Sequence, residues 1–114
     1  MRIVSISYDG SLLTTRQLLL ERAGHQVTSA RSFSAAVVLC EDATFDLLVL
    51  GHSIPILEKS ELVSTFRSHS HAPILSLTRC GEVPVPSDYY ADADQPRELL
   101  ATVAEILAKP PSRR

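Results

Sequence analysis

Short apolar runs alternate with longer amphipathic segments along this chain, and this alternation restricts its fold more than any other feature. Each run is too short for a helix and is bounded by glycine, proline or polar residues, which predicts a strand. The expected strands lie at about 3–6, 27–28, 47–50, 74–78 and 88–91. The run at 47–50 has no polar alternation, which is typical of a strand buried on both faces of a parallel sheet.

The segments between these runs carry apolar residues at helical spacing. Helices are expected at about 12–23, 32–43 and 60–69, with a last helix beginning at Gln95-Pro96, and Gly24 stands where a C-terminal cap belongs. Residues 79–87, RCGEVPVPS, contain two prolines and a glycine, so no helix is expected there. The alternation predicts an α/β fold: a flavodoxin-like, doubly wound, five-stranded parallel sheet of order 2-1-3-4-5, with helix 4 shortened or absent.

Length and composition limit the class of protein. The chain has 114 residues, enough for one core, and we expect one domain over residues 1–109 and a disordered tail over 110–114. The net charge is −2 and the basic residues are dispersed, which indicates neither nucleic acid nor a membrane as a partner. Cys40 and Cys80 are expected to be reduced thiols. With no signal-peptide pattern and no long apolar stretch, a soluble cytoplasmic protein is expected.

Doubly wound folds place their sites outside the carboxyl ends of the strands, near the switch point between strands 1 and 3. That rule selects the segment after Tyr90 and six single residues: Ser7, Tyr8, Asp9, Gly51, His52 and Thr78. There is no glycine-rich phosphate loop, nucleophile elbow or HExxH motif among them. The rule therefore gives a location without a recognisable catalytic motif.

Several features at matching spacing point to one family. They are the helix end LLLERAGHQV, the strand DLLVL opened by Asp46, Pro55 after that strand, the strand PILSLT ending on Thr78, Tyr89, and the last helix start QPRELL. Over nearly its whole length the chain resembles a response-regulator receiver domain, the phosphoacceptor module of two-component phosphorelay signalling. The resemblance implies a flavodoxin-like receiver fold and a role in signal transduction.

A working receiver has an acidic pair after strand 1, an acceptor aspartate after strand 3, a hydroxyl after strand 4 and a lysine after strand 5. The acidic residues hold Mg²⁺, the aspartate is the nucleophile, and the last two bind phosphoryl oxygens. The resemblance places the acidic pair on Ser7 and Tyr8, with Asp9 just beyond, and the acceptor on Gly51. Glycine cannot be phosphorylated, which predicts a degenerate pseudo-receiver with a vestigial pocket.

The remaining pocket positions fall on Thr78, which matches the hydroxyl, and on Asp92, which replaces the lysine and is followed by Ala93 in place of the usual proline. A phosphoryl group about 4 Å from Asp92 would cost roughly 4 kcal/mol per unit of like charge at an effective dielectric of 20. Thr78 and Tyr89 match the switch pair of the family. Whether they act as a switch or serve packing is left open.

For the other candidate residues, a structural or solvent-exposed role is favoured over a binding or redox role. We expect His52 to be a surface-loop residue, and His69 and His71 to form a polar turn without a metal. Asp9 and Asp92 are more readily two solvated carboxylates than a cation site. Cys80 is expected to be an inert thiol.

The leading hypothesis is a stand-alone signalling module, neither an enzyme nor cofactor-dependent. It would act by phosphorylation-independent contact with a protein partner: a kinase, a receptor or another regulator. Whether it forms a homodimer is left open. The alternative is a domain responsive to a small ligand or cation, using the emptied pocket around Gly51. A third, weaker hypothesis is residual phosphorelay through a nonstandard residue.

Overall fold

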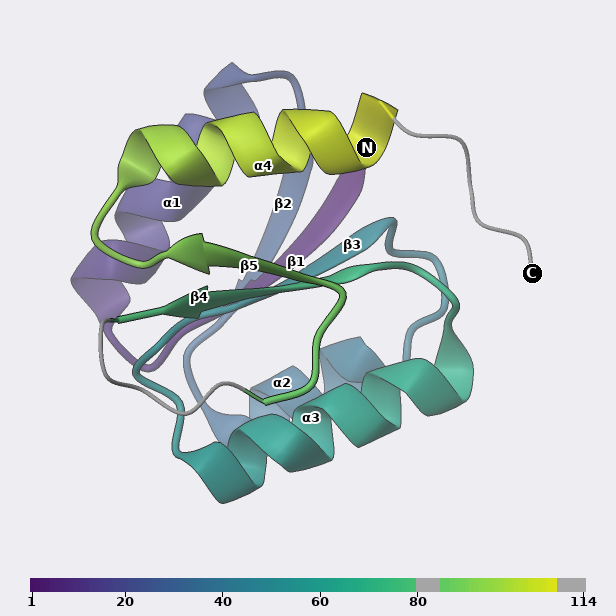
Figure 1. Ribbon diagram of the computed structural model, residues 1–114. Coiled ribbons are helices and arrows are strands. Elements are labelled where there is room, and N and C mark those ends of the chain that lie inside the picture. The colour runs from purple at the N-terminus through teal and green to yellow at the C-terminus, as the bar shows by residue number, and fades with distance from the viewer. Residues whose placement is uncertain (80–84, 109–114) are drawn as a thin grey trace.

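The computed structural model describes residues 1–79 and 85–108, which form one five-stranded parallel sheet of order β2-β1-β3-β4-β5 flanked by helices (Figure 1). The fold class predicted from the sequence is confirmed. The strands are β1 (Arg2–Ile6), β2 (Gln26–Ala30), β3 (Leu47–Leu50), β4 (Ile74–Thr78) and β5 (Tyr89–Asp92). The helices are α1 (Gly10–Arg22), α2 (Phe33–Cys40), α3 (Ile56–His69) and α4 (Pro96–Ala108).

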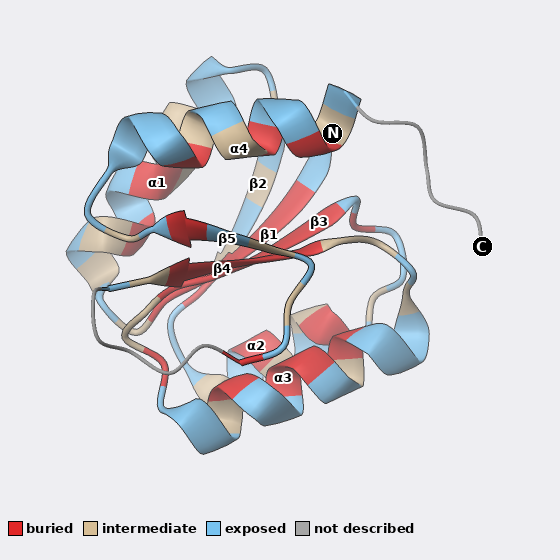
Figure 2. Ribbon diagram, viewed as in Figure 1, coloured by how far each residue is buried: buried red, intermediate tan, exposed pale blue. Residues whose placement is uncertain are grey.

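The sheet is the middle of three layers, with α1 and α4 on one face and α2 and α3 on the other (Figure 1). Alternate residues of the central strands enter opposite clusters: Leu47 and Val49 pack on the α1/α4 side, whereas Leu48 and Leu50 pack on the α2/α3 side. All four side chains are buried (Figure 2). The uninterrupted apolar run of β3 follows from this burial on both faces.

The helix boundaries differ from the prediction mainly at α3, which begins at Ile56 rather than at about residue 60. Pro55 is the N-cap, with φ −56°, and its carbonyl accepts the Lys59 amide. Proline lacks a backbone N–H, but the N–H groups of a first helical turn have no partner within the helix. Pro55 can therefore start a helix here instead of extending the loop. Gly24, just beyond α1, has φ +98°, the left-handed conformation expected of a helix-ending glycine.

The connection from β4 to β5 contains no helix within its described residues, 79 and 85–88. Val85 is buried in the α2/α3 cluster and covers the sheet there. The Tyr90 hydroxyl donates to the Val85 carbonyl and accepts the Ser87 amide, both at 2.9 Å. Packing and hydrogen bonds thus hold residues 85–88 against the sheet.

Two predictions, Cys80 as an inert thiol and residues 110–114 as a disordered tail, lie outside the described residues. Cys40 is a free, buried cysteine, and burial raises the pKa of its thiol to about 12. Within the described ranges no helix is both long and apolar enough to cross a bilayer.

Candidate functional site

The carboxyl ends of the strands bring most of the sequence-predicted residues to one edge of the sheet. Ser7 follows β1, Gly51 follows β3, and Thr78 and Asp92 end β4 and β5 and pair in register. The Gly51 amide donates to the Ile6 carbonyl at 2.8 Å, which continues the pairing of β1 with β3 beyond the strand ends. Ser7, Gly51, Thr78 and Asp92 therefore lie at the carboxyl ends of neighbouring strands, as the switch-point rule predicts.

Gly51 is buried, and the space where a side chain would project is already filled. A Cβ built on Gly51 would lie 3.0 Å from Arg16 Nη1, 3.0 Å from Ser7 Cβ and 3.1 Å from the Ile6 carbonyl oxygen. Such approaches are shorter than ordinary van der Waals contacts, and the carbonyl belongs to a paired strand that cannot move aside cheaply. The position beside Gly51 is thus not an empty pocket, because Arg16 and Ser7 occupy it.

Arg16 was not predicted from the sequence to lie at these strand ends. It lies on α1, its side chain is 5% exposed, and its Nη2 donates to the Ala93 carbonyl at 3.4 Å. Burial lowers the pKa of Arg16, and the carboxylates of Asp9 and Asp94 act in the opposite direction. The signal was present in the spacing, since the buried positions of α1 are Leu13, Arg16 and Leu20, one face of a helix.

Hydroxyl groups occupy the region after β1. Ser7 is buried, and its Oγ lies 3.0 Å from Ser53 Oγ. Ser53 Oγ in turn accepts the amides of Tyr8 at 3.0 Å and Asp9 at 3.3 Å, which ties the loop after β3 to the start of α1. Ser53 was also not predicted, because one serine three residues past a strand end carries no recognisable pattern. The network consists of neutral hydroxyl and amide groups.

The Asp9 carboxylate serves the helix that follows it. Its Oδ1 accepts the amides of Ser11 at 3.1 Å and Leu12 at 3.2 Å, which makes Asp9 the N-cap of α1. The described residues contain no group of three histidine, cysteine, aspartate or glutamate side chains that could hold a metal ion. Asp9, the acidic residue just beyond the positions that match a receiver's acidic pair, therefore caps a helix.

Tyr8 turns away from the strand ends toward α3. Its hydroxyl donates to Glu58 Oε1 at 2.6 Å, and its ring packs against the α2/α3 cluster. Burial, followed by the bond to Glu58 and the charge of that carboxylate, raises the pKa of Tyr8 above its ordinary value. Tyr8 thus anchors α3 to β1.

At the other strand ends, Asp92 is exposed and its Oδ1 accepts the Asp94 amide at 2.8 Å. Thr78 is half-buried, and its carbonyl accepts the Ala93 amide at 2.7 Å. Tyr89 pairs with Leu75, which lies three residues before Thr78 on β4. Tyr89 and Thr78 are therefore about 10 Å apart along the strand direction. The structure brings Thr78 to the cluster and leaves Tyr89 outside it. His52 lies half-buried in the loop before α3.

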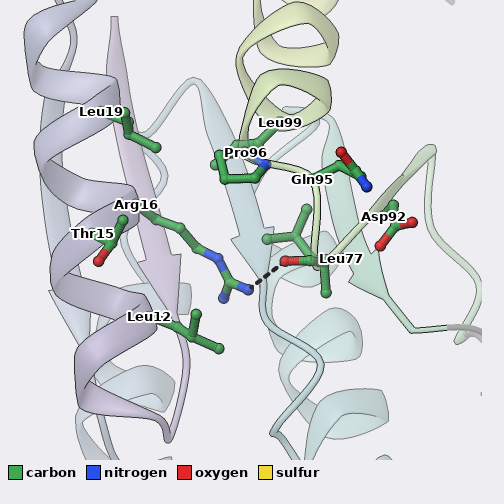
Figure 3. Close-up of a pocket in the computed structure, with 10 residues that line it drawn as sticks. Leu12, Thr15, Arg16, Leu19, Leu77, Asp92, Gln95, Pro96 and Leu99 are labelled. Carbon is green, nitrogen blue, oxygen red and sulfur yellow. Dashed lines mark hydrogen bonds between the residues drawn. The ribbon is translucent and has the colours of Figure 1, made fainter.

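A cavity of about 40 Å³ lies on the α4 side of Arg16. Figure 3 shows the Arg16 side chain reaching from α1 into this space toward the Ala93 carbonyl. Apolar walls come from α1, β4 and α4, and the Asp92 carboxylate also lines it: the apolar residues are Leu12, Leu19, Leu77 and Leu99. The site as a whole therefore has a buried cation supplied by a helix and no nucleophile at the end of β3.

No family model and no curated protein matches this sequence. Solved structures do match its fold. The receiver domain of the hybrid histidine kinase CckA aligns with a TM-score of 0.77 and 19% identity over 94% of this chain and 99% of its own. A CheY-like receiver domain protein from Methanospirillum hungatei gives 0.78 and 22% over 93% and 92%. CheY4 of Vibrio cholerae gives 0.74 and 21% over 92% and 97%. The chain thus has the fold of response-regulator receiver domains.

Proposed function

We propose that this protein is a pseudo-receiver: a receiver-like signalling module that works by contact with a kinase, a receptor or another regulator, independently of aspartyl phosphorylation. The observation that carries the proposal is the pairing of Gly51 with Arg16. The position after β3 has no carboxylate, and an arginine side chain lies where one would project. Aspartyl phosphoryl transfer needs a nucleophile there, and this position supplies none.

The surroundings of Gly51 support the same proposal. Mg²⁺ in a phosphotransfer site is held by carboxylates and neutralises the charge of the transferred group. Here Ser7 and Ser53 form a neutral hydroxyl pair, and Asp9 caps α1. The anion Asp92 stands at the end of β5, where it would repel a phosphoryl group. Nucleophile, metal ligands and stabilising lysine are thus replaced together.

Intact mass measurement tests phosphorylation independence directly. The folded protein is incubated with Mg²⁺ and acetyl phosphate, beside a receiver domain that retains its acceptor aspartate as a positive control. We expect no phosphoryl adduct on this protein and a clear adduct on the control. A stoichiometric adduct would refute the proposal, and its position after proteolysis would identify the acceptor residue.

Contact with a partner is tested by calorimetry against the dimerisation and phosphotransfer domain of a histidine kinase. We expect the dissociation constant to be the same with and without Mg²⁺ and acetyl phosphate. A change in affinity that requires the phosphodonor would contradict phosphorylation-independent recognition.

A further inference from the structure

We propose that the outer edge of β2 pairs with the same edge of a second copy of this chain, in antiparallel orientation about a twofold axis at Thr28. The pairing would join two five-stranded sheets into one and place the two α1 helices side by side. This goes beyond the function proposed above, which concerns contact with other proteins and does not require a dimer.

The first argument is the unpaired backbone along the outer edge of β2. Among the described strands, β2 has β1 as its one neighbour. The Gln26 amide and the Ala30 carbonyl bond to the residues that flank β1, at 2.8 Å and 3.2 Å, so these alternate residues of β2 face β1. Backbone groups alternate in direction along a strand. The N–H and C=O groups of Val27 and Ser29 therefore point away from β1 and are available to another strand.

The second argument is the composition of this edge. Exposed edge strands usually carry charges, prolines or bulges that prevent pairing with another chain. The strand Gln26–Ala30, QVTSA, has no charge and no proline, and it pairs with β1 in unbroken register. The other outer strand, β5, ends on the exposed Asp92. The edge of β2 is therefore the less protected of the two.

The third argument is that β2 is complementary to itself. With the axis at Thr28, Val27 of one copy lies opposite Ser29 of the other, and each such pair exchanges both of its backbone hydrogen bonds. The two Thr28 side chains meet at the axis, and threonines directly opposite each other on neighbouring strands interact favourably. Thr28 is exposed, so its side chain can make this contact without disturbing the core.

The fourth argument is charge, on the face of the sheet that α1 covers. Ser29 Oγ donates to Gln17 Oε1 at 2.8 Å, and Gln17 Nε2 donates to Glu21 Oε2 at 3.2 Å, so this side of α1 lies over β2. Glu21 is in the last turn of α1. Arg31 lies at the start of α1, because its Cζ is 3.3 Å from a Cβ built on Gly10. Antiparallel pairing places the end of one α1 beside the start of the other, so each Glu21 faces the Arg31 of the second copy.

The same arrangement gives α1 a packing partner. The helix packs over β1 and β2, so the two α1 axes on either side of the paired β2 strands would be about 10 Å apart, two strand spacings. This is a normal distance between packed helices. Leu18 precedes Glu21 by three residues, which places both on one side of α1, and it is 52% exposed. Contact with the second helix would cover this apolar side chain.

Sedimentation equilibrium of the full chain tests the proposal. We expect a monomer–dimer equilibrium between micromolar and millimolar protein, with slower hydrogen exchange at the Val27 and Ser29 amides as the dimer forms. Thr28→Lys places two like charges opposite each other at the axis and should weaken dimerisation by about tenfold or more. Ser64→Lys is the charge-matched control, because it adds the same charge on the exposed side of α3 and should leave dimerisation unchanged.

A charge exchange tests the register of the dimer. Glu21→Arg and Arg31→Glu should each weaken dimerisation, and the double variant should restore it, because the ion pair forms again with its charges exchanged. A monomer at every concentration would overturn the proposal, as would a dimer that Thr28→Lys does not weaken or a double variant that stays weak. If a variant does not fold, the dependence of Val27 and Ser29 amide exchange on wild-type concentration decides.

Discussion

At the scale of single residues, Gly51 and Arg16 explain each other. The conformation of Gly51 does not require glycine, because Gly24 is the glycine with positive φ in the described part of the chain. Glycine is required at 51 because the Arg16 guanidinium, Ser7 and a β1 carbonyl approach so closely. The glycine at position 51 and the buried arginine beside it are therefore one structural feature.

Adding one methyl group at this position should be costly. We expect Gly51→Ala to lower the free energy of unfolding by about 1–3 kcal/mol, because its Cβ overpacks a region that includes backbone. Urea unfolding measures the change. Gly10→Ala is the matched control, since the atoms nearest to its Cβ would belong to the flexible side chain of the exposed Arg31. An unchanged free energy of unfolding in Gly51→Ala would show that Arg16 and Ser7 move aside easily.

Restoring the carboxylate should not restore phosphorylation. In Gly51→Asp we expect the new side chain to pair with Arg16, since its Cβ starts 3.0 Å from Nη1, and to gain no phosphoryl adduct with Mg²⁺ and acetyl phosphate. Gly51→Asn has the same shape without the charge and should be less stable than Gly51→Asp by about 1.5–3 kcal/mol. An adduct on Gly51→Asp would show that the missing carboxylate alone prevents the chemistry.

Tyr8 links stability to alkaline pH. Its pKa is raised in the folded protein by burial and by Glu58, so its stabilising contribution is complete below the ordinary tyrosine value near 10 and declines as pH rises above it. We expect Tyr8→Phe to cost about 1 kcal/mol at pH 7 and to lose stability less steeply than the wild type above pH 10. Denaturant unfolding at both pH values checks this. If the free energy of unfolding fell equally with pH in the wild type and Tyr8→Phe, the ionisation of Tyr8 would not contribute to the loss of stability.

At the scale of elements, the described end of the β4–β5 connection, residues 85–88, covers part of the sheet on the α2/α3 side. Val85 closes the core, and the Tyr90 hydroxyl bridges Val85 and Ser87. Asp88 adds a second tie, because its carboxylate accepts the Ile74 amide at 2.8 Å and pairs with Arg67 at 3.4 Å. These hydrogen bonds and the burial of Val85 thus fix residues 85–88 on the sheet.

Removing the Tyr90 hydroxyl should loosen this connection selectively. We expect Tyr90→Phe to cost about 1–2 kcal/mol, the sum of two ordinary hydrogen bonds, and to accelerate hydrogen exchange at the Ser87 amide. Amides of β1 serve as the internal reference. Unchanged exchange at Ser87 would mean that Val85 packing holds the connection without the hydroxyl.

At the scale of the whole molecule, residues 1–79 and 85–108 contain no group of carboxylates that could hold a metal ion, which predicts that magnesium does not change stability. We expect millimolar Mg²⁺ to leave the melting temperature unchanged, because Asp9 caps α1 and the Ser7–Ser53 pair is neutral. NaCl of equal ionic strength is the control. A rise specific to Mg²⁺ would reveal a cation site among Asp9, Asp92 and their neighbours.

The sequence by itself determined the fold class and the edge of the sheet at which the site lies. The periodicity of apolar residues is a local property of the sequence. The strand Leu47–Leu50 and the apolar face of α4 could therefore be predicted without tertiary information. The start of α3 was misplaced because a proline is compatible with both a loop and a first helical turn.

Only the tertiary structure decided what fills the space beside Gly51. Arg16 lies 35 positions earlier in the chain, and nothing local to α1 specifies which strand end its guanidinium reaches. The same holds for Ser53 beside Ser7 and for Asp9 as a cap instead of a ligand. These roles depend on distances between elements, which are set by packing of the whole core and not by sequence spacing.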